Sequence, residues 1–263
     1  MSSISRTDIE EPLFVIEGIV TELHVSLGKE NLLAQVDKHY QAKNIITGLG
    51  AVVGELYGQA AAGAAVAMYE GEYTENFLCL VGDSVVCGTF GGASKLPVGK
   101  KIKAVVTKQG DVLVAKGMLS ESEGLVWVGH AWGYKAERMA NIKIAFWCFL
   151  FQMFCIFCLC LFTGELGTPF FWAMMQISFF GGGALCFGVA LWSGSTMSTL
   201  SDPATEVFRL LGFSEPEKVN LNSYQYGIVY IDELIHSDQT RANYGNIHCY
   251  KKAIEDGKIK LIS

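Results

Sequence analysis

The sequence predicts an α+β membrane protein with three parts: a small β-rich domain, a two-helix transmembrane hairpin and a small α+β tail. Two long apolar runs lie close together in the second half of the chain, and neither contains a charged residue. Short strand-like segments with glycine turns come before these runs, and a mixture of helical and strand-like segments follows them. We therefore divide the chain into residues 1–140, 141–193 and 194–263.

The apolar runs cover Ala145–Phe162 and Pro169–Trp192. A helix needs about 20 apolar residues to cross the roughly 30 Å hydrocarbon layer, and both runs reach this length with their flanks. We expect transmembrane helices at residues 143–163 and 169–192. The alternative, two buried helices of a soluble core, is disfavoured because the rest of the chain is too short to surround them. The connector, residues 163–168, is too short to hold a domain, so both soluble parts are expected on one side of the membrane.

Charges beside the first run predict the orientation of the hairpin. Lys135, Arg138 and Lys143 come before this run, whereas the connector offers one acidic residue and no basic one. Because positive residues stay on the cytoplasmic side, both termini are expected in the cytoplasm. Trp132 and Tyr134 precede the same run, where aromatic side chains form an interfacial belt. We therefore expect these five residues at the membrane interface.

The β-rich domain contains a series of short strand-like segments. Residues 12–38 have strand composition with alternating apolar positions. Turn signals at residues 82–84 and 109–111 each separate two strand-like segments, and residues 125–128 make a further strand. Short strands with glycine turns are typical of a small barrel or a sandwich, and the sequence leaves both alternatives open.

Residues 45–68 are rich in Gly and Ala and are predicted to form a helix. Small residues recur there every four positions, at Gly50, Gly54, Gly58 and Ala62. On a helix they form one smooth stripe that lets another helix approach closely. Two alternatives remain: a glycine zipper that inserts into the membrane or self-associates, and a soluble helix packed against the β domain. The glycines also imitate a dinucleotide fingerprint, but no βα units follow, so we expect no cofactor.

The tail after the second apolar run has weaker signals. Asp202 and Pro203 are expected to start a helix that ends at Gly212. Residues 224–231 and 247–250 have strand composition. These segments together predict a small α+β unit.

The side chains that catalysis needs are scattered along the sequence. The five histidines lie far apart, and no nucleophile or metal motif with the required spacing is present, so we expect neither an enzyme nor a metal site. Five of the eight cysteines lie inside the apolar runs, which fits reduced thiols that act as small apolar side chains. The net charge of −6 argues against a nucleic-acid partner, because that partner requires a concentrated basic face.

Lysines cluster in the second half of the β domain. Three of them, Lys100, Lys101 and Lys103, are expected to contact anionic lipid headgroups, because the inner leaflet attracts basic residues. The alternative is that these lysines lie on a solvent-exposed edge strand and prevent it from pairing with another chain. Both alternatives place these side chains at the surface of the domain.

Three stretches and their order point to a known family. The stretches are Val15–Val20 (VIEGIV), Gly129–Glu137 (GHAWGYKAE) and Asp202–Phe213 (DPATEVFRLLGF). The Gly/Ala-rich segment lies between the first and the second, and the apolar hairpin lies between the second and the third. In this order the chain resembles the bacterial membrane proteins grouped as type VI secretion system effectors. The resemblance covers most of the chain and includes no catalytic signature.

The resemblance implies a multi-pass protein of the bacterial inner membrane. Its partners would be the lipid bilayer and a protein, either a cognate toxin or a secretion component. Whether the chain is an effector or the immunity protein that neutralises one stays open. One hypothesis is a non-enzymatic anchor whose β domain binds the partner. The other is a membrane-active effector whose glycine zipper forms a pore or disrupts the bilayer, and an enzyme acting on membrane lipid is a third alternative. A homo-oligomer is compatible with each.

Overall fold

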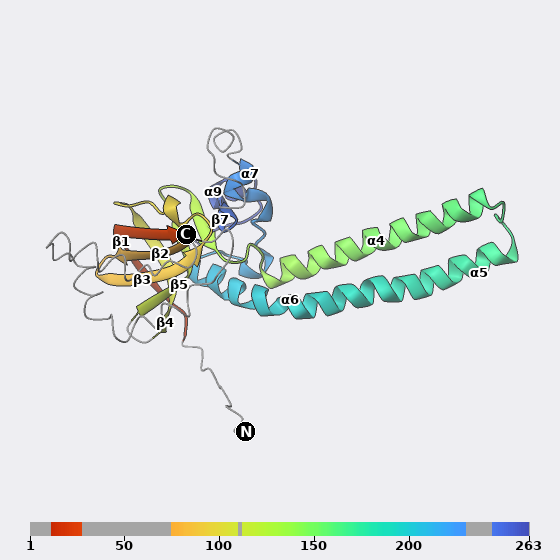
Figure 1. Ribbon diagram of the computed structural model, residues 1–263, viewed down its shortest axis with the longest axis horizontal. Helices are drawn as coiled ribbons and strands as arrows, with labels where there is room; N and C mark the ends of the chain where they lie inside the picture. Colours follow the sequence, from red (N-terminus) through yellow and green to blue (C-terminus); the bar gives the residue numbers. More distant parts are fainter. Residues whose placement is uncertain (1–11, 28–74, 110–111, 230–243, 263) are drawn as a thin grey trace, which may run out of the picture.

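The computed structural model describes residues 12–27, 75–109, 112–229 and 244–262. Figure 1 shows a β-rich head from which a long helical hairpin projects. The chain leaves the head along one arm of the hairpin and returns to it along the other. The expected α+β class, with a β domain and a helical hairpin, is confirmed at this level. The Gly/Ala-rich segment, residues 45–68, lies with its stripe of small residues outside the described residues.

The head is built on a closed five-stranded barrel. Its strands are β1 (Phe14–Leu27), β2 (Glu75–Val81), β3 (Ser84–Phe90), β4 (Lys101–Gln109) and β5 (Val112–Ser120). They follow the order β3-β2-β1-β4-β5 with antiparallel neighbours, and a parallel pairing of β3 with β5 closes the barrel. This is the strand connectivity of an OB-type barrel. The barrel alternative of the sequence is therefore confirmed, and the sandwich alternative is wrong.

β1 is long because it serves both halves of the barrel. Phe14–Ile19 pair with β4, and Val20–Leu27 pair with β2, with a shift in register between Val20 and Glu22. Gly18 lies just before this shift, where a Cβ atom would be only 2.7 Å from the backbone nitrogen of Gly82. Glycine at this position therefore lets β1 pass close to the turn between β2 and β3. That turn confirms the signal at residues 82–84.

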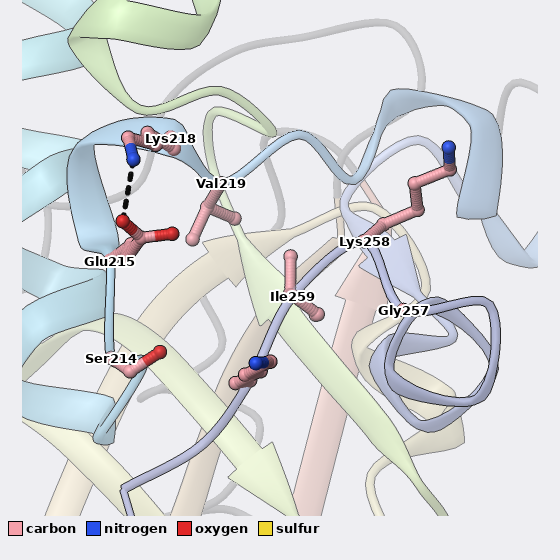
Figure 2. A pocket seen from close by; sticks show the side chains of 8 residues that line it. Ser214, Glu215, Lys218, Val219, Gly257, Lys258 and Ile259 are labelled. Atoms are coloured by element: carbon pink, nitrogen blue, oxygen red, sulfur yellow. Dashed lines mark hydrogen bonds and ion pairs between the residues drawn. The ribbon is translucent and has the colours of Figure 1, made fainter.

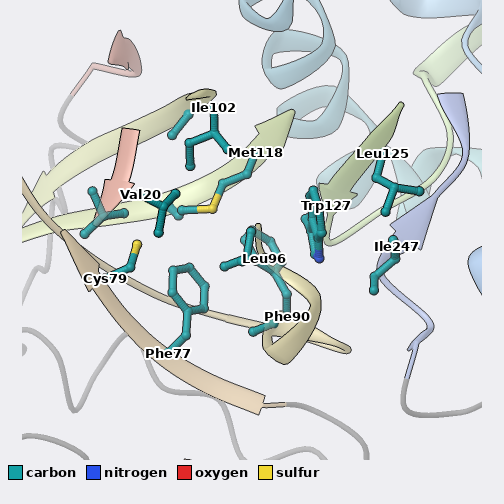
Figure 3. Packing of buried hydrophobic residues seen from close by; sticks show 14 of the residues in the cluster. Val20, Phe77, Cys79, Phe90, Leu96, Ile102, Met118, Leu125, Trp127 and Ile247 are labelled. Carbon is teal, nitrogen blue, oxygen red and sulfur yellow. The ribbon is translucent and has the colours of Figure 1, made fainter. Parts of the chain in front are cut away.

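Aromatic and aliphatic side chains fill the interior of the barrel (Figure 3). The ring of Phe77 is fully buried and stacks on Phe90, with 5.5 Å between the ring centroids. Gly88 makes room for this ring, since a Cβ atom there would lie 2.9 Å from it. The buried indole of Trp127 donates a hydrogen bond to the carbonyl oxygen of Gly92 at 3.2 Å, so its polar atom is satisfied.

The C-terminal tail belongs to the same sheet as the barrel. β6 (Leu125–Val128) pairs with β5, as the strand signal at these residues predicts, and β7 (Ile247–His248) pairs with β6. The short helices of the head are η1 (Ala93–Lys95), η3 (Pro216–Lys218), η4 (Asn222–Tyr224), α7 (Tyr226–Val229) and α9 (Tyr250–Glu255). A second core joins the tail to the barrel, in which Phe213 meets Phe208 at 5.4 Å and Tyr250 at 6.2 Å, both edge to face.

The hairpin has two arms of different length, 29 residues in the first and 43 in the second. The elements are α4 (Tyr134–Phe162) in the first arm and α5 (Pro169–Ile177), the π-helical η2 (Ser178–Gly182) and α6 (Gly183–Leu211) in the second. At 1.5 Å per residue, the 29 residues of α4 correspond to about 43 Å. Both arms therefore extend past the predicted spans and into the head, as Figure 1 shows.

The helix start predicted at Asp202 and Pro203 is wrong, because α6 runs through both residues without a break. A proline inside a helix removes one backbone hydrogen bond and costs about 3 kcal/mol or more. Packing against α4 before the proline and against the barrel after it offsets this cost. The predicted end is confirmed, since Gly212 adopts a left-handed conformation with φ of 100°.

The strand predicted at residues 224–231 is also wrong in its described part, which forms η4 and α7. Only Gln225 of this segment pairs with the sheet, in an isolated antiparallel bridge to His248 of β7. Tyr226 and Val229 instead pack against the core of the barrel from these short helices. The strand predicted at residues 247–250 is confirmed for its first two residues only.

Candidate functional site

The hairpin and its joint with the head form the candidate functional site. Both arms are long and apolar enough to cross a membrane, and only 11% and 17% of their most apolar stretches are buried. Trp147, Phe151 and Trp192 are 68%, 70% and 73% exposed. The core helix of a soluble protein would bury such side chains, whereas both arms of the hairpin expose them.

The two arms pack on each other through one polar contact and several aromatic ones. Gln152 of α4 lies against Gly182, where a Cβ atom would be 2.1 Å from its Nε2. The thiol of Cys186 donates to Gln152 Oε1 at 3.8 Å. The ring of Phe149 meets Phe179 edge to face at 5.7 Å. The single strongly polar side chain of the first apolar run is thus accommodated between the arms.

α6 joins the hairpin directly to the core of the head. Its first two thirds are mostly exposed, whereas Val207, Phe208 and Leu211 are buried in the second core. Val207 packs over Gly117 of β5, where a Cβ atom would lie 2.4 Å from its Cγ1. One continuous helix therefore fixes the direction of the hairpin relative to the barrel.

Backbone hydrogen bonds hold the beginning of α4. The N–H of Gly133 donates to the carbonyl of Val219 at 2.9 Å, and the N–H of Tyr134 donates to Thr205 Oγ1 at 3.0 Å. A Cβ atom at Gly133 would lie 2.2 Å from the carbonyl oxygen of Pro216, so this approach requires glycine. These contacts attach α4 both to the tail and to α6.

A polar cluster of His130, Glu137 and Asn141 lies at this joint. Each contributes a buried side-chain atom that has no hydrogen-bond partner in the described part of the chain. His130 Nε2 and Glu137 Oε2 are 3.4 Å apart, so a protonated His130 would form an ion pair with Glu137. Asn141 lies one helical turn beyond Glu137, and its Nδ2 would be 3.8 Å from a Cβ atom at Gly194. Sequence reasoning missed this cluster, although the i, i+4 spacing of Glu137 and Asn141 before an apolar run was an available signal.

The predicted interface residues lie at the joint or just beyond it. Trp132 forms a backbone bridge with Asn220, and Tyr134 is 38% exposed. Lys135 Nζ pairs with a carboxylate oxygen of Glu217 at 2.9 Å. This hydrogen bond raises the pKa of Lys135 and lowers the pKa of Glu217. The structure therefore uses Lys135 to attach α4 to the tail.

The two basic residues nearest to the apolar arm are Arg138 and Lys143. Both are exposed on α4, and within the ranges that the structure describes neither has a carboxylate partner. They remain available for an external anion. Their contact with a membrane interface stays a prediction.

The three lysines predicted to contact lipid headgroups each have a partner in the head. Lys100 pairs with Glu123, and Lys101 pairs with Glu17 at 2.7 Å. Lys103 donates to the carbonyl oxygen at the end of α6 at 3.3 Å. These contacts engage the ammonium groups within the head, and headgroup contact stays a prediction.

His248 and Cys249 are neighbours in the sequence but do not form a base and a nucleophile. Burial lowers the pKa of His248 to about 4, and its Nδ1 lies 3.1 Å from the carbonyl oxygen of Leu221. Burial raises the pKa of the Cys249 thiol to about 11. At neutral pH both groups are therefore uncharged and enclosed in the core of the head.

The cysteines act as apolar side chains in the structure. All eight are free thiols, and burial raises the pKa of Cys87 to about 12.

Among residues 12–27, 75–109, 112–229 and 244–262, no three His, Cys, Asp or Glu side chains come together in a way that could hold a metal ion.

A small cavity of about 70 Å³ lies between two distant segments of the tail (Figure 2). Residues 214–219 form one wall and residues 257–260 the other, and the N–H of Ser214 donates to the carbonyl of Lys260 at 2.9 Å. Lys218 in this cavity pairs with Glu215 at 2.5 Å. The sequence gives no signal for this cavity, because its two walls are about 40 residues apart.

Comparisons with protein-family models, with curated proteins and with solved structures found no match for this chain. The description of the fold therefore rests on its own strand pairings. The functional argument rests on the hairpin, on its joint with the head and on the sequence pattern.

Proposed function

We propose that the protein is a non-enzymatic membrane anchor that holds a binding barrel at the cytoplasmic face of the bacterial inner membrane. α4 and the α5–α6 arm cross the bilayer as a hairpin, and the head stays in the cytoplasm. The observation that carries this proposal is the exposed apolar surface of the hairpin. The unbroken passage of α6 into the core of the head supports it, because a rigid connection is what an anchor needs.

The length of the joint fits a head that lies at the membrane surface. The continuous apolar part of α4 begins at Ile144, and Tyr134, ten residues earlier, is bonded to the head. Ten residues of helix rise about 15 Å, which is enough to pass through the headgroup layer. On α6 a similar distance separates Trp192 from Ser201, which is buried. The unpaired basic residues of α4 then lie at headgroup depth.

The charge distribution supports a cytoplasmic head. Lys135, Arg138 and Lys143 lie on the head side of the apolar arm, and Glu165 lies in the connector. Basic residues near the ends of membrane helices favour the cytoplasmic side. The anionic inner leaflet would attract the two unpaired cations on this side.

The partner that we propose for the barrel is a protein. The interior of the barrel is packed with side chains such as Phe77 and Met118, which favours binding on its outer surface over binding of a small molecule inside. The sequence resemblance suggests a cognate toxin or another component of a type VI secretion system. In this proposal the chain is an effector-associated or immunity component of that system.

A membrane-active effector is the second candidate, and the four-residue spacing of Gly50, Gly54, Gly58 and Ala62 favours it. A stripe of this kind lets helices associate closely in a bilayer. Depolarisation of the membrane distinguishes this candidate from an anchor.

The test is the growth and membrane potential of a bacterial host after modest induction of the full chain. An anchor predicts normal growth and normal potential, with the protein in the carbonate-resistant membrane fraction. Gly54→Leu at a matched membrane level is the control, because Leu would block close helix approach. Depolarisation by the wild type but not by this variant would favour the effector. Recovery of the protein in the soluble fraction would contradict both.

A further inference from the structure

The two glutamines of the hairpin lie in opposite environments. Gln152 faces the other arm, where Cys186 donates to it. Gln176 of α5 is exposed on the outside of the hairpin and, among the described residues, has no hydrogen-bond partner. It lies seven residues, or about 10 Å, from the start of the second arm, so in the proposed insertion its amide is surrounded by hydrocarbon. A polar group in this environment requires a partner that the single hairpin does not provide.

The π-helical segment η2 aligns Gln176 with small residues further along the arm. A π turn adds one residue to a helix, so eight residues that include η2 make about two full turns. Gln176, Phe180 and Ala184 therefore lie on one line, and Gly188 follows one turn later. All four are exposed, and a Cβ atom at Gly188 would meet nothing within 4 Å. We call these four residues the Gln176 face.

The occupant that fits this face is a second copy of the chain. An amide carries both a donor and an acceptor, so two identical glutamines can pair across a two-fold axis. Two copies share one orientation in the membrane, and their Gln176 side chains therefore lie at the same depth. Ala184 and Gly188 have the small-xxx-small spacing that lets two helix backbones approach closely.

The geometry points to a homodimer that forms in the membrane through the Gln176 face of the α5–α6 arm. This inference rests on the proposed bilayer insertion of the hairpin. In the dimer the two α5–α6 arms are adjacent, and the two α4 helices lie on the outer sides. The heads are then held side by side at the membrane surface, and each dimer presents two barrels to a partner.

Photo-crosslinking of the full chain in native membranes tests this arrangement. Benzoylphenylalanine replaces Phe180 in one sample and Phe151 of α4 in a matched control, because these side chains are 71% and 70% exposed. A dimer through the Gln176 face predicts a band at twice the monomer mass from position 180 and none from position 151. Equal crosslinking from both positions, or crosslinking from position 180 only to a host protein of another mass, would overturn the inference.

Gln176→Leu in the position-180 sample tests the role of the amide. An interhelical hydrogen bond in a membrane corresponds to a loss of about 3- to 30-fold in association when it is removed. We expect the dimer band to fall by this factor, and Ala184→Leu to lower it independently through steric contact. A dimer band that neither substitution changes would contradict dimerisation through the Gln176 face.

The amount of protein in the carbonate-resistant fraction distinguishes a failure of membrane anchoring from a failure of dimer formation. Protein that is absent from this fraction contradicts membrane anchoring itself. Protein that is present there without a dimer band contradicts only the homodimer.

Discussion

The head and the hairpin use the same residue types in opposite ways. Phe77 in the barrel is fully buried, whereas Phe151 on α4 is 70% exposed. Apolar side chains fill the interior of the barrel, and a second apolar core shared with α6 and the tail covers part of its outside. The arms of the hairpin are apolar nearly all round, so one partner helix leaves most of their surface uncovered. The head thus carries its own core, and the hairpin leaves most of its apolar side chains exposed.

The largest expected change in stability comes from a Phe→Ala substitution in the barrel, and the same substitution in the hairpin is its control. Phe77→Ala leaves a cavity in the barrel and should lower the free energy of unfolding by about 3–5 kcal/mol. Phe151→Ala removes an exposed ring from α4 and should leave the stability of the head unchanged. Denaturant unfolding of the full chain in detergent micelles measures both. Equal losses from the two variants would contradict the contrast between the regions.

A pH change should also separate the regions. The pKa of His248 is about 4 in the folded head, below its ordinary value of about 6.5, so the folded state prefers the neutral ring. Its contribution is present above pH 6.5 and is lost as the pH falls towards 4, by up to about 3 kcal/mol.

His248→Gln isolates this effect from other titrating groups. We expect the wild type to lose more stability than the variant between pH 7 and pH 4.5, measured by urea unfolding in micelles. The helical signal of the hairpin should stay constant, because the apolar runs at 145–162 and 169–192 contain no Asp, Glu, His, Lys or Arg. Identical pH profiles for the wild type and the variant would show that His248 is not enclosed as described.

The smallest expected change in stability comes from a substitution where α6 packs against the barrel. Gly117→Val would force a side chain into Val207 of α6 and should cost about 1–3 kcal/mol through overpacking. Gly129→Val is the matched control, because a Cβ atom there meets nothing within 4 Å. Thermal unfolding compares the two, and limited proteolysis after Leu211 reports whether α6 has loosened from the barrel. No difference between the variants would argue against rigid attachment.

Local signals predict much of this structure. The turn at 82–84 and the strand at 125–128 follow from residue type and spacing, and the hairpin follows from the two uncharged runs. The closure of the barrel could not be predicted, because it depends on the pairing of Val86 and Cys87 with strand β5 across a long stretch of chain. A parallel pairing of this kind has no local sequence signature.

The joint was less predictable than the hairpin for the same physical reason. The position of Trp132 and Lys135 before an apolar run predicts an interfacial role, but their partners Asn220 and Glu217 lie more than 80 residues away in the sequence. Local propensity favours Pro203 in the first turn of a helix, which is why the sequence predicts a helix start there. Packing on both sides of this proline outweighs that propensity in α6.

The most direct test of membrane anchoring is the accessibility of the connector, residues 163–168, to protease. A cleavage site is inserted between Gly164 and Glu165 of the full chain, and intact spheroplasts are treated with the matching protease from outside. A hairpin that crosses the membrane with a cytoplasmic head predicts cleavage at the connector, while a second site inserted at Gly129 is cut only after the membrane is permeabilised. A protected connector with an accessible head, or cleavage at neither site before permeabilisation, would contradict the proposed topology.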